Sequence, residues 1–230
     1  ANSAALAAAG ITAASKDPPG GHVRRLPGSA EPDGVLEETA AYAVLRQIYA
    51  RGPASPVPGL LAALDLYAAE GFTTVQDGAA SAGDIAAIEA HVSNTGKPLP
   101  VDLVAFPSFT GLGKEAQANC AVPVGKTYAG GFRVGGTKFV LDGSPQGRTA
   151  WLSKPYLLPP EGKGADYVAY PTVEKNAFMR DVAACIAAGV PVLAHANGDA
   201  AIQLLIDSVA NEIGEAKVDH RTVIIHAQLM

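Results

Sequence analysis

Residues 190–209 read Val-Pro-Val-Leu-Ala-His-Ala-Asn-Gly-Asp-Ala-Ala-Ile-Gln-Leu-Leu-Ile-Asp-Ser-Val, and this stretch decides the fold class. It opens with a short apolar run, typical of a buried strand, that ends at His195. Asp199 can then cap a helix whose apolar residues recur along one face. These residues are Ile202, Leu205, Ile206 and Val209. A buried strand followed directly by an amphipathic helix is the repeating unit of a mostly parallel sheet.

The same alternation of strand-like and helical patterns continues along the chain from Leu60 onward, which predicts an α/β fold. One helix follows the N-cap pattern Ser81-x-x-Asp84, and Thr172 is the predicted cap of another. The predicted strands are 72–76, 101–106, 132–141, 190–195 and 221–226. Such a series fits an open doubly-wound sheet or part of a closed barrel. No glycine-rich nucleotide loop follows any strand, which disfavours the nucleotide-binding sheets.

Composition excludes several classes of protein. The 230 residues are 48% hydrophobic and 17% charged, which is typical of a globular chain, and the net charge of −5 gives no reason to expect nucleic acid or an anionic membrane as partner. No apolar run approaches the roughly 20 residues of a membrane span. Two cysteines make no disulfide framework, and Cys185 is expected to be a small core residue. We therefore expect a cytoplasmic protein.

Two predicted strands end in histidine, at His195 and His226. Chemistry in such folds is found where strands end and loops begin. A single histidine there is more often structural. Neighbouring parallel strands lie about 4.8 Å apart, so two imidazoles at one level can share a metal ion at about 2.1 Å from each nitrogen. The pair therefore favours a metal site.

Lys138 lies on the predicted strand before these two, on the same face as Val140 and Asp142. Its ammonium group could pair with Asp142 or Asp77 and simply help to fill the interior. A buried lysine with a lowered pKa could instead form a Schiff base, as in lyases. A third possibility is a lysine that is carboxylated by CO₂ and bridges metal ions. The residues by themselves leave all three open.

Several segments of the chain, in order, resemble amidohydrolase family 3, the group of YtcJ-like and N-substituted formamide deformylase-like proteins. The strongest matches are His195-Ala-Asn-Gly-Asp-Ala-Ala, His226-Ala-Gln and Lys138-Phe-Val-Leu-Asp-Gly-Ser. The others are Ala1-Asn-Ser-Ala-Ala-Leu, Asp17-Pro-Pro-Gly-Gly, Gly34-Val-Leu-Glu-Glu-Thr-Ala, Gly71-Phe-Thr-Thr-Val-Gln-Asp-Gly and Lys154-Pro-Tyr. The resemblance covers nearly the whole chain.

This resemblance implies a metal-containing (β/α)₈ barrel that hydrolyses amide-like C–N bonds of a small molecule, with zinc as the usual metal. His195 and His226 would be metal ligands on the fifth and sixth strands, and Lys138 would be the fourth-strand lysine that many relatives carboxylate. Residues 17–36 would form a hairpin-like flap. The residues expected to bind substrate are Asp142, Ser144, Trp151 and Asn197, with the loop 143–171. Phe109 and Tyr156 hint at an aromatic pocket.

Two groups of the family pattern are not found in this chain. The first-strand His-x-His pair is absent, and the late-strand aspartate would lie beyond Met230. A barrel of this type takes about 250 residues. We therefore expect 1–59 to be a flap or insertion region and 60–230 to be strands two to six of an incomplete barrel, without the first and last strands.

Such a fragment would be inactive alone, and it would oligomerise or pair with the remainder of the protein because an unclosed barrel exposes strand edges. Two alternatives remain. The chain could be a catalytically dead barrel piece with a binding role or none, or it could belong to a Schiff-base lyase that uses Lys138.

Overall fold

The computed structural model describes residues 1–52, 55–108, 120, 124–214 and 219–230. Its helices are α1 (Ser3–Ala8), α2 (Tyr42–Ala50), α3 (Val57–Ala69), α4 (Ala82–Thr95), α5 (Lys175–Ala187) and α6 (Asp199–Ile213), with a 3₁₀ turn at Thr39–Ala41. Its strands are β1 (Gly21–Arg25), β2 (Pro32–Glu38), β3 (Thr74–Ala80), β4 (Asp102–Pro107), β5 (Phe132–Val134), β6 (Thr137–Val140), β7 (Val192–Ala196) and β8 (Val223–His226). The predicted α/β class is confirmed.

Two parallel sheets, β3-β4-β5 and β6-β7-β8, carry the strands in the order in which they follow along the chain. A parallel bridge between Ser108 and Lys138 joins the end of β4 to β6. The strand predicted at 132–141 is therefore wrong as a single strand, because β5 pairs with β4 whereas β6 pairs with β7. Sequential parallel pairing of this kind is the arrangement expected of consecutive βα units.

The break between β5 and β6 falls at Gly135 and Gly136, where the chain passes from one sheet to the other. A Cβ atom on Gly135 would overlap the side chains of Val104 and Phe106. One on Gly136 would overlap the backbone carbonyl of Pro191. The two glycines thus allow the sheets to approach closely where the chain crosses between them.

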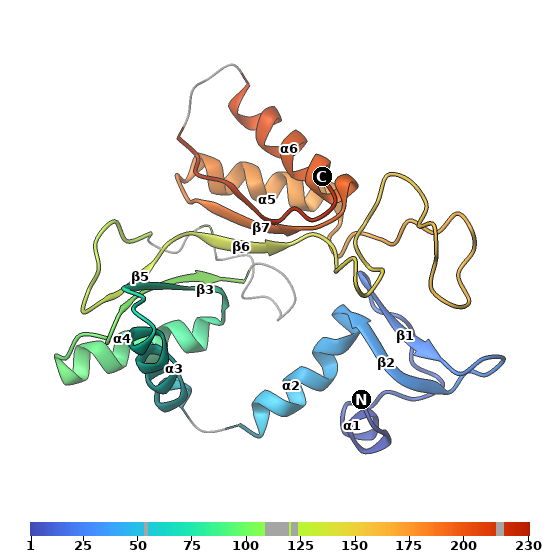
Figure 1. The fold of residues 1–230 in the computed structure, drawn as a ribbon, viewed down its shortest axis with the longest axis horizontal. Helices are drawn as coiled ribbons and strands as arrows, with labels where there is room; N and C mark the ends of the chain where they lie inside the picture. Colours follow the sequence, from blue (N-terminus) through green and yellow to red (C-terminus); the bar gives the residue numbers. More distant parts are fainter. Residues whose placement is uncertain (53–54, 109–119, 121–123, 215–218) are drawn as a thin grey trace.

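Helices cover the sheets on opposite sides of the molecule, with α5 and α6 on β6–β8 and α3 and α4 on β3–β5 (Figure 1). Along β7, Val192 and Ala194 pack against the helices, whereas Leu193 packs on the other face against Val104 and Phe106 of β4. Since side chains alternate along a strand, His195 faces the same way as Leu193, into the space between the sheets.

The capping predictions had mixed outcomes. Ser81 and Asp84 form the expected capping box at the start of α4. Thr172 does not cap α5: the Glu174 carboxylate does, accepting from the Asn176 and Ala177 amides, while the Thr172 hydroxyl donates to the Val140 carbonyl. Either residue type can cap a helix, so the local pattern did not decide between them.

A disulfide joins Cys120 to Cys185, which is buried in α5. The sequence predicted a buried Cys185, which is confirmed, but it did not predict this bond, since 65 residues separate the two cysteines along the chain and no local pattern indicates their contact. No helix of the described residues combines the length and apolar character that a bilayer crossing requires.

The antiparallel hairpin of β1 and β2 lies beside the loop 143–171, far along the chain from it (Figure 1). The Thr149 hydroxyl donates to Glu38 Oε1 at 2.7 Å, and the Tyr170 hydroxyl donates to Glu37 Oε2 at 3.1 Å. Burial, and then the Glu37 carboxylate, raise the pKa of Tyr170, so its hydroxyl keeps the proton that it donates. The hairpin expected near residues 17–36 is present, and its role as a flap stays a prediction.

We expect Gly136→Ala to destabilise the protein by about 1–3 kcal/mol, because the added methyl group would push against the Pro191 backbone. Thermal unfolding followed by circular dichroism would show it as a melting temperature lower by roughly 2–4 °C per kcal/mol. Gly59→Ala is the matched control, since Gly59 lies inside α3 with open space around it, and it should leave the protein as stable or more so. Equal melting temperatures for the two variants would contradict this account of the strand break.

Candidate metal centre

His195 lies near the end of β7, and its Nε2 edge is held by the two loops that follow β6 and β7. Nε2 is 3.1 Å from the Gly143 carbonyl oxygen and 3.1 Å from Asn197 Nδ2, with Asp142 Oδ1 at 3.5 Å. The ring is 18% exposed. A histidine fixed through one nitrogen by a backbone carbonyl is the usual arrangement of a metal ligand, because the bond orients the ring and sets its tautomer.

His226 ends β8 and brings its ring to 4.7 Å from that of His195, edge to face. The sheet register pairs His195 with Ile225, and Ala196 with His226. Strict alternation would therefore turn His226 toward the helices, as Ile224 is turned. The backbone instead takes a left-handed conformation at His226 (φ 75°), which breaks the alternation and accounts for the contact between the rings.

The environment of His226 favours a neutral ring. Burial lowers the pKa of His226, and the nearby positive charges of His195 and Lys138 lower it further, against an opposing effect of Asp142. A neutral imidazole is the form that binds a metal ion. His226 can therefore act as a nitrogen ligand.

Lys138 lies on β6 opposite Leu193 of β7 and is 8% exposed. Burial lowers the pKa of its amine. The ion pair with Asp142 or Asp77 considered above is not present among the described residues. A buried lysine with no counter-ion in the described part of the chain is a candidate functional group, because charge at such a position is costly unless it is used.

Asp142 is fully buried and holds the two loops together. Its carboxylate accepts hydrogen bonds from the backbone amides of Asn197 (3.0 Å), Gly198 (2.7 Å) and Trp151 (2.9 Å). Burial raises the pKa of Asp142, while these three amides and His195 act in the opposite direction. The packing is tight, since a Cβ on Gly198 would overlap the Trp151 backbone. Asp142 is thus placed to order the site.

The other residues predicted to bind substrate lie close to Asp142. Asn197 is 2% exposed, and its amide contacts His195 and Gly143. The Ser144 hydroxyl accepts from the Gly147 amide, and the Trp151 ring carries the Lys175 ammonium over its face at 4.5 Å. Their substrate contacts stay predictions. Phe109 lies outside the described residues.

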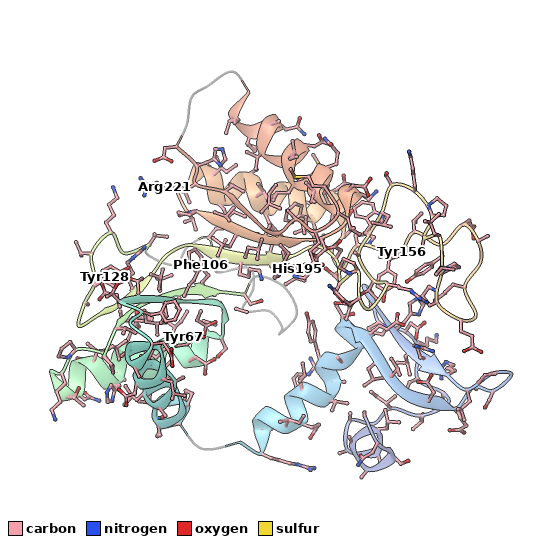
Figure 2. The ribbon with its side chains drawn as sticks, in the orientation of Figure 1. Tyr67, Phe106, Tyr128, Tyr156, His195 and Arg221 are labelled. Atoms are coloured by element: carbon pink, nitrogen blue, oxygen red, sulfur yellow. A yellow bond between two sulfur atoms is a disulfide. The ribbon has the colours of Figure 1, made fainter. Side chains whose placement is uncertain are left out.

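Tyr156, on the loop 143–171, and Asp199, at the start of α6, have roles that the sequence did not indicate. Tyr156 donates to the Ala150 carbonyl at 2.7 Å and so helps to order the loop itself; Figure 2 shows it in the loop region to the right of His195. Asp199 does not cap α6. It is the first helical residue, and its Oδ1 accepts from the Ser153 amide at 2.8 Å.

Sequence reasoning missed the Gly143 carbonyl and the Glu38 carboxylate. Gly143 touches His195 through its backbone, which no side-chain pattern reveals. Glu38 belongs to the Gly34-Val-Leu-Glu-Glu-Thr-Ala match, the one available signal, but only the folded hairpin brings it against Gly143. Of the remaining histidines, His22 contacts Asp17 and His220 contacts Thr222. Within the described residues, no three His, Cys, Asp or Glu side chains group closely enough to hold a metal ion.

The strands are parallel and follow the order of the chain, and two imidazoles and a buried lysine lie on three adjacent strands. This arrangement places the chain in an α/β fold class that includes metal-dependent hydrolases. Two solved structures share the fold, both of uncharacterized metal-dependent hydrolases. The one from Pyrococcus horikoshii OT3 has a TM-score of 0.65 and 20% identity, with 91% of this chain and 39% of that chain covered. The one from Pyrococcus furiosus has a TM-score of 0.64 and 21% identity, with 96% and 42% covered.

The chain belongs to the amidohydrolase family, whose model matches residues 1–230. It is also similar to the exoenzymes regulatory protein AepA of Pectobacterium carotovorum subsp. carotovorum, with 28% identity over 214 residues, 91% of this chain and 44% of that protein. The chain therefore spans less than half the length of these relatives. Family membership supports a hydrolase function.

We expect Asp142→Asn to lower the free energy of unfolding by about 2–4 kcal/mol. The asparagine side chain keeps one acceptor oxygen, but its NH₂ group faces a backbone N–H that donates to the carboxylate in the parent protein. Chemical denaturation would measure the loss. Asp207→Asn is the control, because Asp207 lies exposed on α6 with a single contact to Gln203, and its change should stay within about 0.5 kcal/mol. A loss at Asp142 no larger than the control's would refute the ordering role.

Proposed function

We propose that this chain supplies part of the site of a metal-dependent amidohydrolase that hydrolyses an amide-like C–N bond of a small molecule. The observation that carries the proposal is the pair of imidazoles, His195 and His226, 4.7 Å apart on adjacent parallel strands and next to the buried Lys138. Membership of the amidohydrolase family supports it.

The two histidines fit a divalent metal, for which zinc is the best match. Zinc accepts neutral imidazole nitrogens, and its sites are completed by further nitrogen, sulfur or oxygen ligands. The chemistry of His226, whose surroundings lower its pKa, suits that role. Lys138 would become an oxygen ligand if its neutral amine were carboxylated. A bound ion of this kind acidifies a water and polarises the carbonyl of the substrate.

The residues around the histidines keep the site in place. The Gly143 carbonyl orients His195, and the Asp142 carboxylate fixes the backbone of Asn197 and Gly198. Trp151 and Ser144, on the loop 143–171, are proposed to line the space for the substrate. A loop of this length in a compact domain is commonly a binding loop.

We further propose that the strands of the two parallel sheets are consecutive strands of a (β/α)₈ barrel. In chain order they are β3, β4, β5 together with β6 as one strand, β7 and β8. Their parallel pairing in chain order and the likeness to the two hydrolase structures support this. The chain spans 44% of AepA and 39–42% of those structures. The remaining ligands and the proton-transfer group are therefore proposed to come from other parts of a longer protein, and the 230 residues by themselves to be inactive.

Replacing either histidine tests the metal site. We expect His195→Ala and His226→Ala each to weaken Zn²⁺ binding by more than about 100-fold, because removing even a partner of a ligand costs about 10–100-fold. Competition with a fluorescent chelator would measure the affinity. His91→Ala, on helix α4, is the control and should leave the affinity unchanged. Chelation that removes the metal from the full-length protein without loss of amidase activity would rule the proposal out.

Lys138 leaves a second candidate function, a Schiff-base lyase, because its amine is buried, has a lowered pKa and has no ion-pair partner among the described residues. The amidohydrolase proposal makes the opposite prediction. Borohydride with small carbonyl compounds should leave Lys138 unlabelled in peptide mass spectrometry, and bicarbonate should raise the amount of Zn²⁺ bound. Lys138→Met should abolish that bicarbonate effect. A reduced adduct on Lys138 would favour the lyase.

A further inference from the structure

Asn197 has a buried side-chain amide that protein stability does not explain. The residue is 2% exposed, and its Oδ1 has no hydrogen-bond partner among the described residues. A buried acceptor left unpaired destabilises the folded protein. Exceptions of this kind in folded proteins call for a functional reason.

The other half of the amide is used at the Gly143 carbonyl, beside His195. Asn197 Nδ2 is 2.9 Å from the Gly143 carbonyl oxygen and 3.1 Å from His195 Nε2. The same Gly143 oxygen is 3.1 Å from His195 Nε2. Because Nε2 carries either a proton or a lone pair, its contact with the carbonyl oxygen makes it a donor, and the Gly143 oxygen then accepts from both Nε2 and Asn197 Nδ2. Nδ1 is the ring nitrogen that no described residue binds.

The backbone of Asn197 is anchored independently of its side chain. Its amide donates to Asp142 Oδ1 at 3.0 Å, and the next amide, of Gly198, donates to Asp142 Oδ2 at 2.7 Å. A substitution at 197 keeps both bonds. The side chain can therefore be changed without releasing the loop, so an effect on His195 can be attributed to the lost amide.

We propose that Asn197 is a positioning residue that holds the Gly143 carbonyl against the Nε2 edge of His195, so that Nδ1 faces the metal. This inference rests on the proposed function and deepens it. A ring that binds metal through Nδ1 carries its remaining proton on Nε2, where the Gly143 carbonyl accepts it. Asn197 keeps that carbonyl in place through its own N–H and prevents the ring from turning over, which would offer Nε2 instead.

Asn197→Leu tests this, since leucine has a similar shape and removes both the donor and the unpaired oxygen. We expect a melting temperature close to that of the parent, because the unpaired Oδ1 is removed and the Gly143 carbonyl keeps its contact with His195. We expect Zn²⁺ affinity weaker by about 10–100-fold. In ¹⁵N NMR of the histidine rings, Zn²⁺ should shift the Nδ1 resonance of His195 in the parent protein. In the variant both ring nitrogens should respond, as a mixture of orientations.

Ser208→Ala is the matched control, because Ser208 is also buried, 1% exposed, with its hydroxyl bonded to the Leu204 carbonyl and no contact with His195. Its Zn²⁺ affinity and ring signals should equal those of the parent. Asn197→Ser replaces the leucine variant if thermal melting shows that the latter does not fold.

The outcomes separate this inference from the proposed function. Parent-like Zn²⁺ affinity and an unchanged Nδ1 response in the Asn197 variant, together with weak binding by His195→Ala, would overturn the positioning role and leave the metal site standing. Parent-like binding by His195→Ala would overturn the proposed function itself. Weaker binding by both, with a mixed ring signal at Asn197→Leu, is the expected result.

Discussion

The buried Asp142 carboxylate is the contact on which the rest of the site depends. It satisfies backbone amides from two connections, the one after β6, at Trp151, and the one after β7, at Asn197 and Gly198. A buried carboxylate is costly unless several donors surround it, and three amides with His195 nearby meet that condition. Because Gly143 follows Asp142 directly, fixing the carboxylate also fixes the carbonyl that contacts His195. The place of the histidine is therefore set by a residue that need not bind metal itself.

Much of the fold follows from local sequence, because the alternation of apolar runs and helical patterns is a property of neighbouring residues. It predicted the α/β class, four of the five strand positions to within a few residues, and the placement of His195 and His226 on adjacent strands. The division of 132–141 could not be predicted in this way. It results from the approach of Phe106 and Pro191 to two glycines, and both partners lie far away in the sequence.

The alternation of side chains along a strand also could not predict the contact between the two histidine rings. Alternation alone would direct His226 to the helix side of β8 with Ile224. The left-handed backbone at His226 (φ 75°) and Ala227 (φ 47°) changes that direction. Neither residue is glycine, the type that most often marks such a conformation in a sequence. Backbone of this kind costs of order 1–3 kcal/mol per residue and is found disproportionately where function requires it. Here the strained backbone includes His226, whose ring must turn away from the helices to contact that of His195.

Glu38, which ends β2, also has a positive φ (47°), and it contacts the loop 143–171. Its Oε1 accepts from Thr149 and lies so close to Gly143 that a Cβ there would overlap it. Gly143 in turn contacts His195 through its carbonyl. A chain of direct contacts therefore runs from the hairpin through Gly143 to the histidine. These contacts join the hairpin, the loop after β6 and the end of β7, although 111 positions separate Glu38 from Thr149.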